Sequence, residues 1–406
     1  MRMSTILPGV LRRLRKPYRA VRSFRLWQRY TLRIFRGTAR GTELPLRMAY
    51  AGKSNENRHW LVDRVFGDQV EIEHERRLWA VQAQAAVLSR RWDSDLAVCE
   101  TLPPADESRV PSGSYLLPFW VELAMGITEA DLKGWWERYR KIRSQIRRSG
   151  LSYAVRSDWA AFEAFYHTMY IPHIRHLYGP AARTAPYEYV RSIHEESLLL
   201  LAMQGDTPVA GILIDLEHRE PVLRVHGVLD AAPQYVKAGA FSSLVLFAVE
   251  ELRSRGFDRI NFGGSRPILN DGPLHFKRLF RASVVEKPQP RDGDFMLTPR
   301  RDTPAVRQVL LANPFAFWRG KPLMDWAVFI DRRQLEAIDT LCDTLQHLAV
   351  AGLQTLHLHV FDAAGTDSLA EAAIPLAKSL GVPVRIDRWP SSAVIPCVPP
   401  GSLPQS

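Results

Sequence analysis

Apolar and polar residues alternate with clear periods through the middle of the chain. Three short apolar runs separated by polar turns predict strands. A longer stretch then carries apolar side chains at steps of three and four and ends at Gly256, as expected of a helix with a glycine C-cap. A short apolar run follows and predicts a buried strand. The predicted elements are strands 197–203, 207–216 and 221–229, a helix 238–256 and a strand 258–262.

The first half of the chain shows a similar mixture of periods. Thr128 and Asp131 have the form of a capping box, and Asp158 stands where a helix N-cap is expected. The helix predicted after Thr128 is strongly basic on its surface and ends at Gly150. The predicted elements are strands 70–75, 96–102, 115–123 and 151–155 and helices 77–90, 128–149 and 158–177.

The last third of the chain follows a different order. Residues 287–325 begin with a stretch rich in proline and charge and are interpreted as a linker. Residues 326–390 then predict strand, helix, strand, helix and strand, a small βαβαβ unit with parallel strands. This unit carries no glycine-rich phosphate loop. Residues 391–406 are rich in Pro and Ser and predict a flexible tail.

Length and cysteine content limit the class of protein. A chain of 406 residues with 46% apolar and 24% charged residues predicts a globular protein of two or three domains. Its three cysteines, Cys99, Cys342 and Cys397, are scattered and form no CxxC motif. They predict neither a disulfide framework nor a zinc site, and they fit a reducing, cytoplasmic compartment.

The positive charge is concentrated in residues 1–40. This arm contains twelve Lys and Arg residues and no Asp or Glu. Because the whole chain has a net charge of +11, the remainder is close to neutral at −1. Apolar residues between Leu7 and Val21 recur at steps of three and four and predict an amphipathic helix. No apolar run is long enough for a secretory signal or a membrane span.

Three roles remain open for this arm. A basic face opposite Leu, Trp and Tyr suits peripheral attachment to an anionic membrane surface. Arginines interleaved with aromatic residues also suit nucleic acid. In the third interpretation, the arm packs on the rest of its own protein through its apolar side chains.

Polar groups are dense just after the strand predicted at 258–262. Six of them fall within thirteen residues, and such a density after a buried strand is typical of a site. A solvated surface loop would explain the same composition. The six residues are Ser265, Arg266, Asn270, Asp271, His275 and Lys277.

This stretch resembles the closing segment of the FemAB-like and BioF2-like acyltransferases, tandem members of the GNAT (N-acyltransferase) superfamily. The resemblance lies in a Gly-Ser turn, the step Asn270-Asp271-Gly272, and Phe276-Lys277-Arg278. Family members continue to Trp-Gly-Ala, where this chain has Phe280-Arg281-Ala282, so Arg281 stands in place of the glycine. The resemblance covers roughly residues 60–286 and is strongest from Ser197 onward.

The resemblance implies an α+β fold with two tandem GNAT-like domains built on mixed sheets. The first would span 41–186 and the second, catalytic domain would span 187–286. The C-terminal βαβαβ unit and the basic N-terminal helical arm would be additions that the family does not cover.

The resemblance also implies roles for the clustered residues. Lys277 would stabilise the oxyanion of the tetrahedral intermediate. Asp271 or His275 would accept the proton of the acceptor amine. Arg266 would hold an anionic group of the acceptor, with Ser265, Asn270 and Phe276 as further substrate contacts. Other readings are an Asx-turn for Asp271 and a solvated surface position for Lys277 and His275.

The acyl donor of such enzymes lies between two parting strands, with its phosphates at a helix N-terminus. The residues in that place are Lys237, Gly239, Ser242 and Ser243. The pyrophosphate loop Gln/Arg-x-x-Gly-x-Gly/Ala of acetyl-CoA enzymes is absent. The donor is therefore either an acyl-CoA, such as acetyl-CoA, or another donor such as an aminoacyl-tRNA. No carboxylate or cysteine accompanies His167, His173 and His176 at ligand spacing, so we expect no metal.

Three hypotheses for function follow. The first is an acyltransferase at the cytoplasmic face of the membrane that acylates an amine or hydroxyl of a polysaccharide, cell-wall or lipid-linked acceptor. The second is a catalytically silent scaffold with a GNAT fold in an exopolysaccharide assembly complex. The third is a nucleic-acid binder that works through the arm; its binding would be salt-sensitive and lost without residues 1–40.

Overall fold

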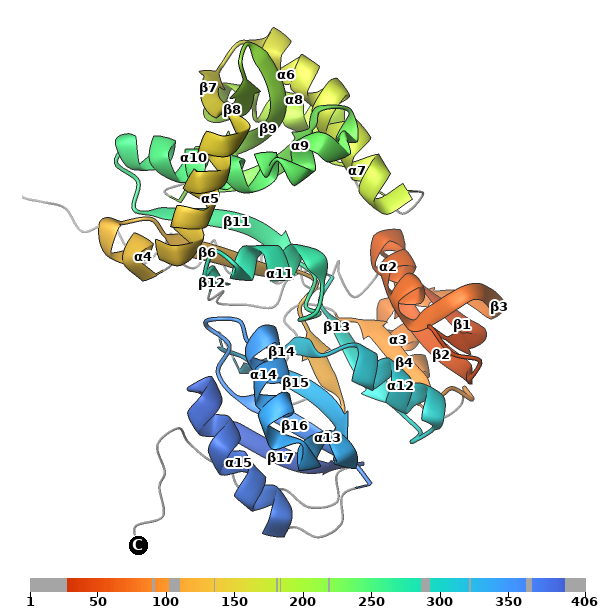
Figure 1. Cartoon of the computed structure of the whole chain (residues 1–406). Helices are drawn as coiled ribbons and strands as arrows, with labels where there is room; N and C mark the ends of the chain where they lie inside the picture. The colour runs from red at the N-terminus through yellow and green to blue at the C-terminus, as the bar shows by residue number, and fades with distance from the viewer. Residues whose placement is uncertain are drawn as a thin grey trace, which may run out of the picture.

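Three β-sheets organise the chain, and helices pack on each of them (Figure 1). The seven-stranded sheet lies at the top of this view, the six-stranded sheet on the right and the four-stranded sheet at the bottom. Parallel and antiparallel strand pairs occur together, which confirms the predicted α+β class with mixed sheets. The computed structural model describes residues 28–89, 92–101, 110–134, 136–179, 182, 184–217, 220–285, 293–320, 323–362 and 367–390.

The seven-stranded sheet contains all four strands predicted between residues 197 and 262. Its strand order is β12-β6-β11-β10-β9-β8-β7, and only β10 and β11 are parallel neighbours. Two of its strands come from the predicted first domain, so this sheet crosses the boundary placed at 186/187. The strands are β6 (Val121–Gly126), β7 (Leu151–Arg156), β8 (Ser197–Gln204), β9 (Thr207–Asp215), β10 (Val222–Val228), β11 (Arg259–Ser265) and β12 (Ser283–Val284).

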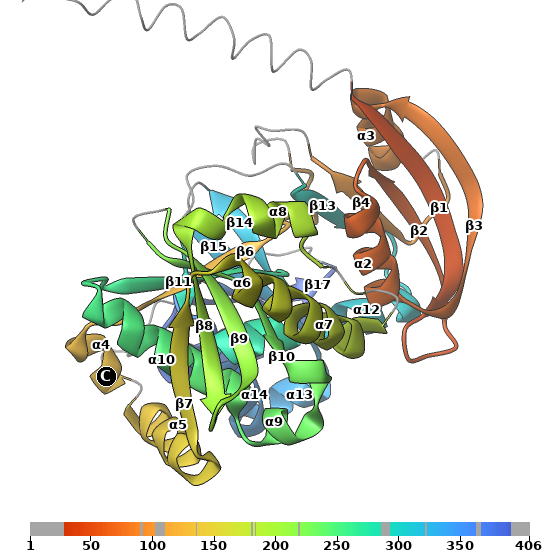
Figure 2. The same cartoon turned by 90° about the horizontal axis from the view of Figure 1, so that it is seen from above.

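Helices cover both faces of this sheet (Figure 2). Helix α10 packs on one face, against Leu198 and Leu200, and α6 and α7 pack on the other, against Leu199 and Leu201. The alternation of these leucines along β8 follows from the period of two in a strand. The helices of this part are α4 (Glu129–Gly134), α5 (Trp136–Ser149), α6 (Trp159–Phe165), a π-helical segment (Tyr166–Tyr170), α7 (Ile171–Tyr178), α8 (Tyr187–Ser192), α9 (Pro233–Lys237) and α10 (Ala240–Ser254).

Both predicted helix starts are confirmed. The Asp131 amide donates to the Thr128 hydroxyl, and the Thr128 amide donates to the Asp131 carboxylate. The Asp158 carboxylate accepts from the Ala161 amide. Each side chain satisfies an amide that the first turn of a helix leaves without a partner.

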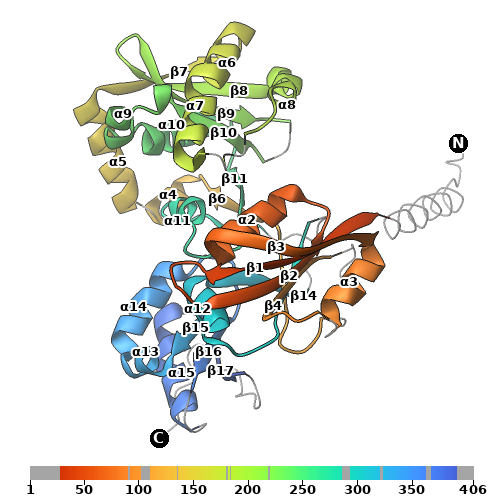
Figure 3. The same cartoon turned by 90° about the vertical axis from the view of Figure 1, so that its right-hand side faces the viewer.

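The six-stranded sheet has the order β3-β1-β2-β4-β13-β5, and Figure 3 shows its strands β1 to β4. Helix α3 packs on one face, while α2 and α12 pack on the other. The elements are β1 (Arg29–Ala39), β2 (Pro45–Gly52), α2 (Asn55–Val65), β3 (Phe66–Trp79), α3 (Ala80–Leu88), β4 (Leu96–Glu100), β5 (Tyr115–Leu117), β13 (Phe295–Pro299) and α12 (Pro304–Ala312).

Strand β1 corrects the prediction of a helical arm over residues 1–40. Tyr30, Leu32 and Ile34 are buried and alternate with more exposed residues, and β1 pairs with β2 on one side and β3 on the other. This period of two is characteristic of a strand, and it replaces the helical spacing found nearer the N-terminus. Arg33 pairs with Glu75 at 2.7 Å, so part of the positive charge is compensated within the sheet. The predicted amphipathic helix lies in residues 1–27, outside the described residues.

Residues 287–325 were predicted to be a linker, and their described part is instead folded. Strand β13 lies between β4 and β5 and pairs with both, α12 follows, and β14 (Phe315–Gly320) begins the next sheet. The prediction was wrong because the proline- and charge-rich start of this stretch was taken to represent all of it. Phe295 and Phe315 are both buried.

The four-stranded sheet has the order β14-β15-β16-β17 and confirms the βαβαβ unit. Its last three strands are parallel, and β14 adds an antiparallel strand at the edge. The remaining elements are β15 (Leu323–Asp331), α13 (Arg332–Glu336), α14 (Ile338–Leu348), β16 (Leu356–Phe361), α15 (Asp367–Leu380) and β17 (Val384–Trp389). The predicted tail, 391–406, lies outside the described residues.

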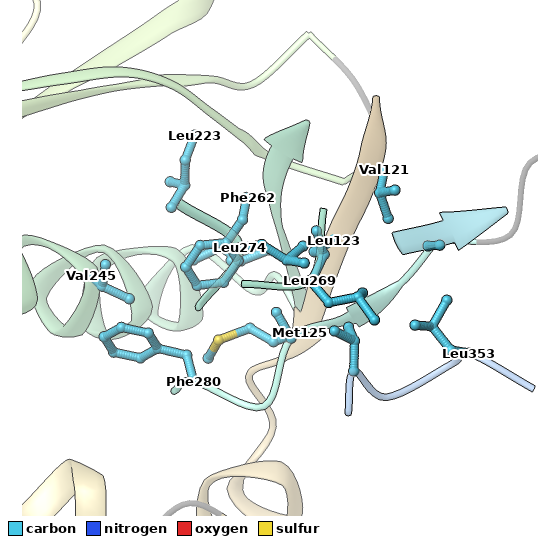
Figure 4. Close-up of a cluster of buried hydrophobic side chains, with 14 of the residues drawn as sticks. Val121, Leu123, Met125, Leu223, Val245, Phe262, Leu269, Leu274, Phe280 and Leu353 are labelled. Atoms are coloured by element: carbon cyan, nitrogen blue, oxygen red, sulfur yellow. The ribbon is translucent and has the colours of Figure 1, made fainter. Parts of the chain in front are cut away.

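A continuous apolar cluster joins the seven-stranded sheet to the four-stranded one (Figure 4). It includes Leu123 and Met125 of β6, Phe262 of β11, and Leu353 from the loop before β16. Within the part of the chain that the structure describes, no helix is long and apolar enough to cross a membrane.

Candidate active site

The parallel strands β10 and β11 part from each other. They share one registered pair, Val222 with Asn261, near the start of β10. Beyond this pair β10 follows β9 as far as Val228, and β11 follows β6 as far as Ser265. The two strands therefore separate toward their carboxyl ends, as the family resemblance implies for an acyl-donor site.

A short helix, α11 (Gly272–Arg278), follows β11, so the second half of the polar segment 265–277 is helical and is not a surface loop. Its N-cap is Asp271, and Pro273 lies in the first turn, where a missing amide proton costs no hydrogen bond. Leu274 and Lys277 are buried, one turn apart on the same side of the helix. The helix therefore directs Lys277 inward, and the alternative of a solvated lysine is excluded.

Lys277 lies against the end of β11. Its Nζ donates hydrogen bonds to the carbonyl oxygens of Gly263 at 3.0 Å and Gly264 at 2.7 Å. The side chain is only 8% exposed. Gly263 has a φ of +69°, a left-handed conformation that favours glycine. The two glycines thus present neighbouring carbonyls to one buried amine.

Burial lowers the pKa of Lys277 to about 7. Loss of hydration disfavours the ammonium form, and the carboxylates of Glu122 and Asp271 only partly oppose this effect. The amine is therefore close to half protonated at neutral pH. An amine with this balance can accept a proton and return it.

Asp271 lies within the electrostatic reach of Lys277. Burial raises the pKa of Asp271, while Arg64, Arg266 and Lys277 lower it in part. As N-cap of α11 it makes no side-chain capping hydrogen bond. Its carboxylate is thus not used in the Asx-turn that its sequence context allowed.

A stack of aromatic rings lines the same region. The His226 ring of β10 lies 4.3 Å from Phe241 of α10, measured between centroids, and Phe241 lies 4.4 Å from Phe276 of α11. Phe276 continues to Phe280 at 5.1 Å. Burial lowers the pKa of His226 to about 3, with smaller contributions from His173 and Lys277, so its imidazole is neutral. These rings form a largely apolar wall beside the buried amine.

The structure does not bring His275 to this group. His275 is exposed on α11, and its Nδ1 lies 2.7 Å from a guanidinium nitrogen of Arg278. Its pKa is lowered, first by partial burial and then by Arg278. Of the two predicted proton acceptors, Asp271 is therefore the one near Lys277.

Arg266 has partners within the chain. Its guanidinium lies 4.0 Å from the ring centroid of Phe119, 4.2 Å from that of Trp120 and 4.7 Å from that of Trp60. It also forms an ion pair with Glu56 of α2 at 2.9 Å. These contacts tie the end of β11 to the six-stranded sheet, so they support a structural role where the sequence predicted an acceptor contact.

The other predicted substrate contacts, Ser265 and Asn270, differ in their hydrogen bonding. Ser265 is 2% exposed, and its hydroxyl has no hydrogen-bond partner among the described residues. Asn270 accepts a hydrogen bond from Arg64 at 2.6 Å and donates one to the carbonyl of Ala312. Asn270 therefore organises the loop before α11.

The predicted phosphate contacts at the start of α10 do not form an open cradle. Gly239 has a φ of +80°, and a Cβ placed on it would lie 2.3 Å from the side chain of Gln145 on α5. The Ser243 hydroxyl donates to the Gly239 carbonyl and is buried. Lys237 is exposed and Ser242 is half-buried. Gln145 therefore covers Gly239, and its Nε2 donates to the Lys237 carbonyl at 3.2 Å.

Among the described residues, no group of three His, Cys, Asp or Glu side chains could hold a metal ion. The prediction of no metal was made from spacing alone and stays a prediction.

Several residues of the site gave no signal in the sequence. Glu122 is a partly exposed residue of a short strand, and Arg64 and Gln145 belong to helices whose charged and polar residues read as solvated surface. The pairing of β6 with β11 places Glu122 here, the packing of α5 on α10 places Gln145, and the hydrogen bond to Asn270 places Arg64.

Comparisons with known proteins give likeness of structure only. No protein-family model matches the chain, and no curated protein matches it in sequence. The structure is similar to that of FemX, with 10% identity, a TM-score of 0.35, and coverage of 65% of this chain and 83% of that one.

Two further solved structures are similar to this chain. L-PGS from Bacillus licheniformis is 9% identical, with a TM-score of 0.32 and coverage of 69% of this chain and 88% of that one. A GCN5-related N-acetyltransferase from Kribbella flavida is 13% identical, with a TM-score of 0.23 and coverage of 81% and 72%. Because these TM-scores are low, we base the function on the parting strands and the residues around Lys277.

Proposed function

We propose that the chain is an acyltransferase of the GNAT and FemAB-like kind, and that Lys277 is its central catalytic residue. The observation that carries this proposal is a buried amine with a pKa near 7, placed where two parallel strands part. The acceptor is an amine or hydroxyl of a cell-envelope, polysaccharide or lipid-linked compound. This acceptor class, the donor class and the location at the inner face of the membrane rest on the family resemblance.

The geometry supports a two-part role for Lys277. In its neutral form, two N–H groups reach the carbonyls of Gly263 and Gly264, and the lone pair can take the proton of an acceptor amine as that amine attacks the donor carbonyl. The resulting ammonium has a third N–H, which can donate to the oxyanion. When the tetrahedral intermediate collapses, the same proton passes to the leaving group, so Lys277 returns to its neutral form.

The remaining residues act on this amine. Glu122 and Asp271 raise its pKa, which is otherwise lowered by burial. The rings of Phe241 and Phe276 lie 4.4 Å apart between centroids, and Phe276 directly precedes Lys277 in the chain. The donor is an acyl-CoA or an aminoacyl-tRNA, and the position of Gln145 disfavours a coenzyme A pyrophosphate over Gly239.

The same position of Gln145 supports the second candidate, a catalytically silent scaffold. A scaffold has no need for a phosphate cradle, whereas an enzyme has a use for an amine that titrates near pH 7. We favour the enzyme because a buried lysine that forms no ion pair with any described residue is costly to keep.

The first test is a thermal-shift screen of the full chain against coenzyme A, several acyl-CoAs and deacylated tRNA. A ligand at a hundred times its dissociation constant stabilises the native state by about 2.7 kcal/mol. With the donor class known, Lys277→Met should lower the rate of transfer about 10²- to 10³-fold, the loss typical of removing one oxyanion donor.

The matched control is Lys378→Met, which removes an exposed lysine of α15 and should leave transfer unchanged. The rate of transfer in the wild type should rise with pH through an apparent pKa near 7. Silence toward every donor would favour the scaffold, whereas full transfer by Lys277→Met would show an enzyme in which Lys277 is not catalytic.

A further inference from the structure

A second group of charged side chains lies in a pocket of about 310 Å³ between β5 and the four-stranded sheet. The pocket shares no lining residue with the group around Lys277. Its lining includes Phe317, Trp318, Arg319, Asp325, His357 and Arg385.

Strand register explains why these residues meet. Phe317 of β14 is the partner of Asp325 on β15, and His357 of β16 is the partner of Arg385 on β17. Ala327, two residues after Asp325 and therefore on the same face, is the other partner of His357. The four side chains thus form a row across one face of the sheet, near the start of its parallel strands.

Asp325 is the fixed centre of this row. It is 1% exposed and accepts hydrogen bonds from the Thr355 amide at 3.0 Å and from His357 Nε2 at 2.8 Å. Arg319 Nε lies 3.7 Å from the same carboxylate. Because an ionised carboxylate only accepts hydrogen bonds, His357 Nε2 carries the proton of this contact and Nδ1 remains for another partner. Asp325 therefore sets the orientation of the imidazole.

Two guanidinium groups line the pocket, and each uses only some of its N–H donors in the contacts described within the chain. Arg319 uses Nη1 for the Thr355 hydroxyl at 2.9 Å, and Arg385 uses Nε for Asp387 at 3.0 Å. A guanidinium has five N–H donors, so each of these internal contacts leaves several for a ligand. Planar groups of this kind match the geometry of a carboxylate or phosphate.

The other walls of the pocket are aromatic. Phe317 lies 5.1 Å from the His357 ring, measured between centroids, and Tyr115 and Trp318 complete the lining. Apolar walls with a few converging polar groups are the usual composition of a small-molecule site, and the volume lies at the lower end of the usual range.

We propose that this pocket binds a small organic anion. Arg319 and Arg385 hold its carboxylate or phosphate, and its apolar body lies against Phe317, Trp318 and the His357 ring. Asp325 is a positioning residue that acts through His357. The site is independent of acyl transfer at Lys277.

The test is calorimetric titration of the full chain with phenyl phosphate, benzoate and inorganic phosphate. We expect phenyl phosphate or benzoate to bind with a dissociation constant in the millimolar range or below, and the stronger of the two identifies the anionic group. Inorganic phosphate should bind more weakly because it lacks the apolar body. Arg385→Gln should weaken binding at least tenfold, since it removes a charge-assisted contact.

The matched control is Arg332→Gln, which removes an arginine that pairs with Glu336 on the surface of the same unit. This variant should bind the probes as the wild type does. The ¹³C signal of the His357 ring should shift when the probe is added to the wild type and to Arg332→Gln, and stay in place for Arg385→Gln. No binding of either organic probe at 10 mM (about a hundred times a 0.1 mM dissociation constant), or equal binding by Arg385→Gln, would overturn the proposal.

A variant of Asp325 tests the positioning role. Asp325→Asn keeps the side-chain shape and removes the charge, so we expect weaker binding of the probe and a changed pH titration of the His357 signal. If this variant does not fold, the result with Arg385→Gln still decides the proposal, because Arg385 is only half-buried.

Discussion

Lys277 and Arg266 are two buried cations of one segment, and each is 8% exposed. Lys277 makes hydrogen bonds to two backbone carbonyls. Arg266 makes an ion pair with Glu56 and lies among three aromatic rings. The two side chains are therefore equally buried, but different groups compensate their positive charges.

The comparison shows that the partners of a buried cation decide its chemistry. Neutral carbonyls accept hydrogen bonds from an amine in either protonation state, so burial can lower the pKa of Lys277 to about 7. A guanidinium stays charged, and the carboxylate and rings around Arg266 stabilise that charge. Lys277 is suited to proton transfer, and Arg266 to holding two parts of the fold together.

The largest expected effect concerns the pH dependence of stability at Lys277. Below pH 7 the native state holds a buried ammonium group. Between pH 7 and 10.5 the native state has lost this proton while the unfolded chain retains it, so the free energy of unfolding rises with pH. Lys277→Met removes this contribution and should be more stable than the wild type at pH 6 by about 5 kcal/mol, at ~1.4 kcal/mol per pKa unit.

Urea denaturation of both proteins at pH 6 and pH 10 measures this difference, which should shrink as the pH rises. Lys378→Met, the exposed control, should show no such trend. A difference that stays constant with pH would mean that Lys277 keeps an ordinary pKa.

The next effect is on stability at Arg266. Arg266→Met should lower the free energy of unfolding by about 3 kcal/mol, because it leaves Glu56 without its partner and removes the cation from the rings. Arg266→Lys should fall between the two, since lysine keeps the charge and loses the planar contacts. Urea denaturation gives both values. A stable Arg266→Met that has lost transfer would restore the acceptor role predicted from the sequence.

The smallest effect concerns Arg281, in the turn after α11. Arg281 has a φ of +54°, a left-handed conformation that costs a non-glycine residue energy. Arg281→Gly should raise the free energy of unfolding by about 0.5 kcal/mol, since relief of strain slightly exceeds the added entropy of the unfolded chain. Arg281→Ala keeps the Cβ and should show no gain. Equal stability of both variants would mean that the turn carries no strain.

Much of the fold could be predicted from the pattern of apolar residues. Local periods of apolar residues predicted several elements that the structure contains. These are the strands from Ser197 to Ser265, helix α10 and the C-terminal βαβαβ unit. Strand β13 could not be predicted because it has only five residues, and the strands it pairs with, β4 and β5, lie nearly two hundred residues earlier in the sequence. Strand β1 was missed because its alternation follows a basic stretch with helical spacing.

The sequence predicted which segment holds the site better than it predicted the role of each residue. The sequence indicated that Asp271, Phe276 and Lys277 belong together. It could not show that His275 faces away from Lys277, because the short helix that separates them was predicted as a loop. Nor could it show that Gln145 lies over Gly239, since the two residues are far apart in sequence.

The place of β13 also bears on how the protein is made. Strand β5 ends at Leu117, but β13, which lies between β4 and β5, begins only at Phe295. As the chain leaves the ribosome, β4 and β5 have no neighbour between them until residue 299 has been synthesised. The N-terminal sheet is thus completed after the seven-stranded sheet, although its first strands are translated early. A truncated chain ending at Val285 would keep these strand edges open and prone to aggregate.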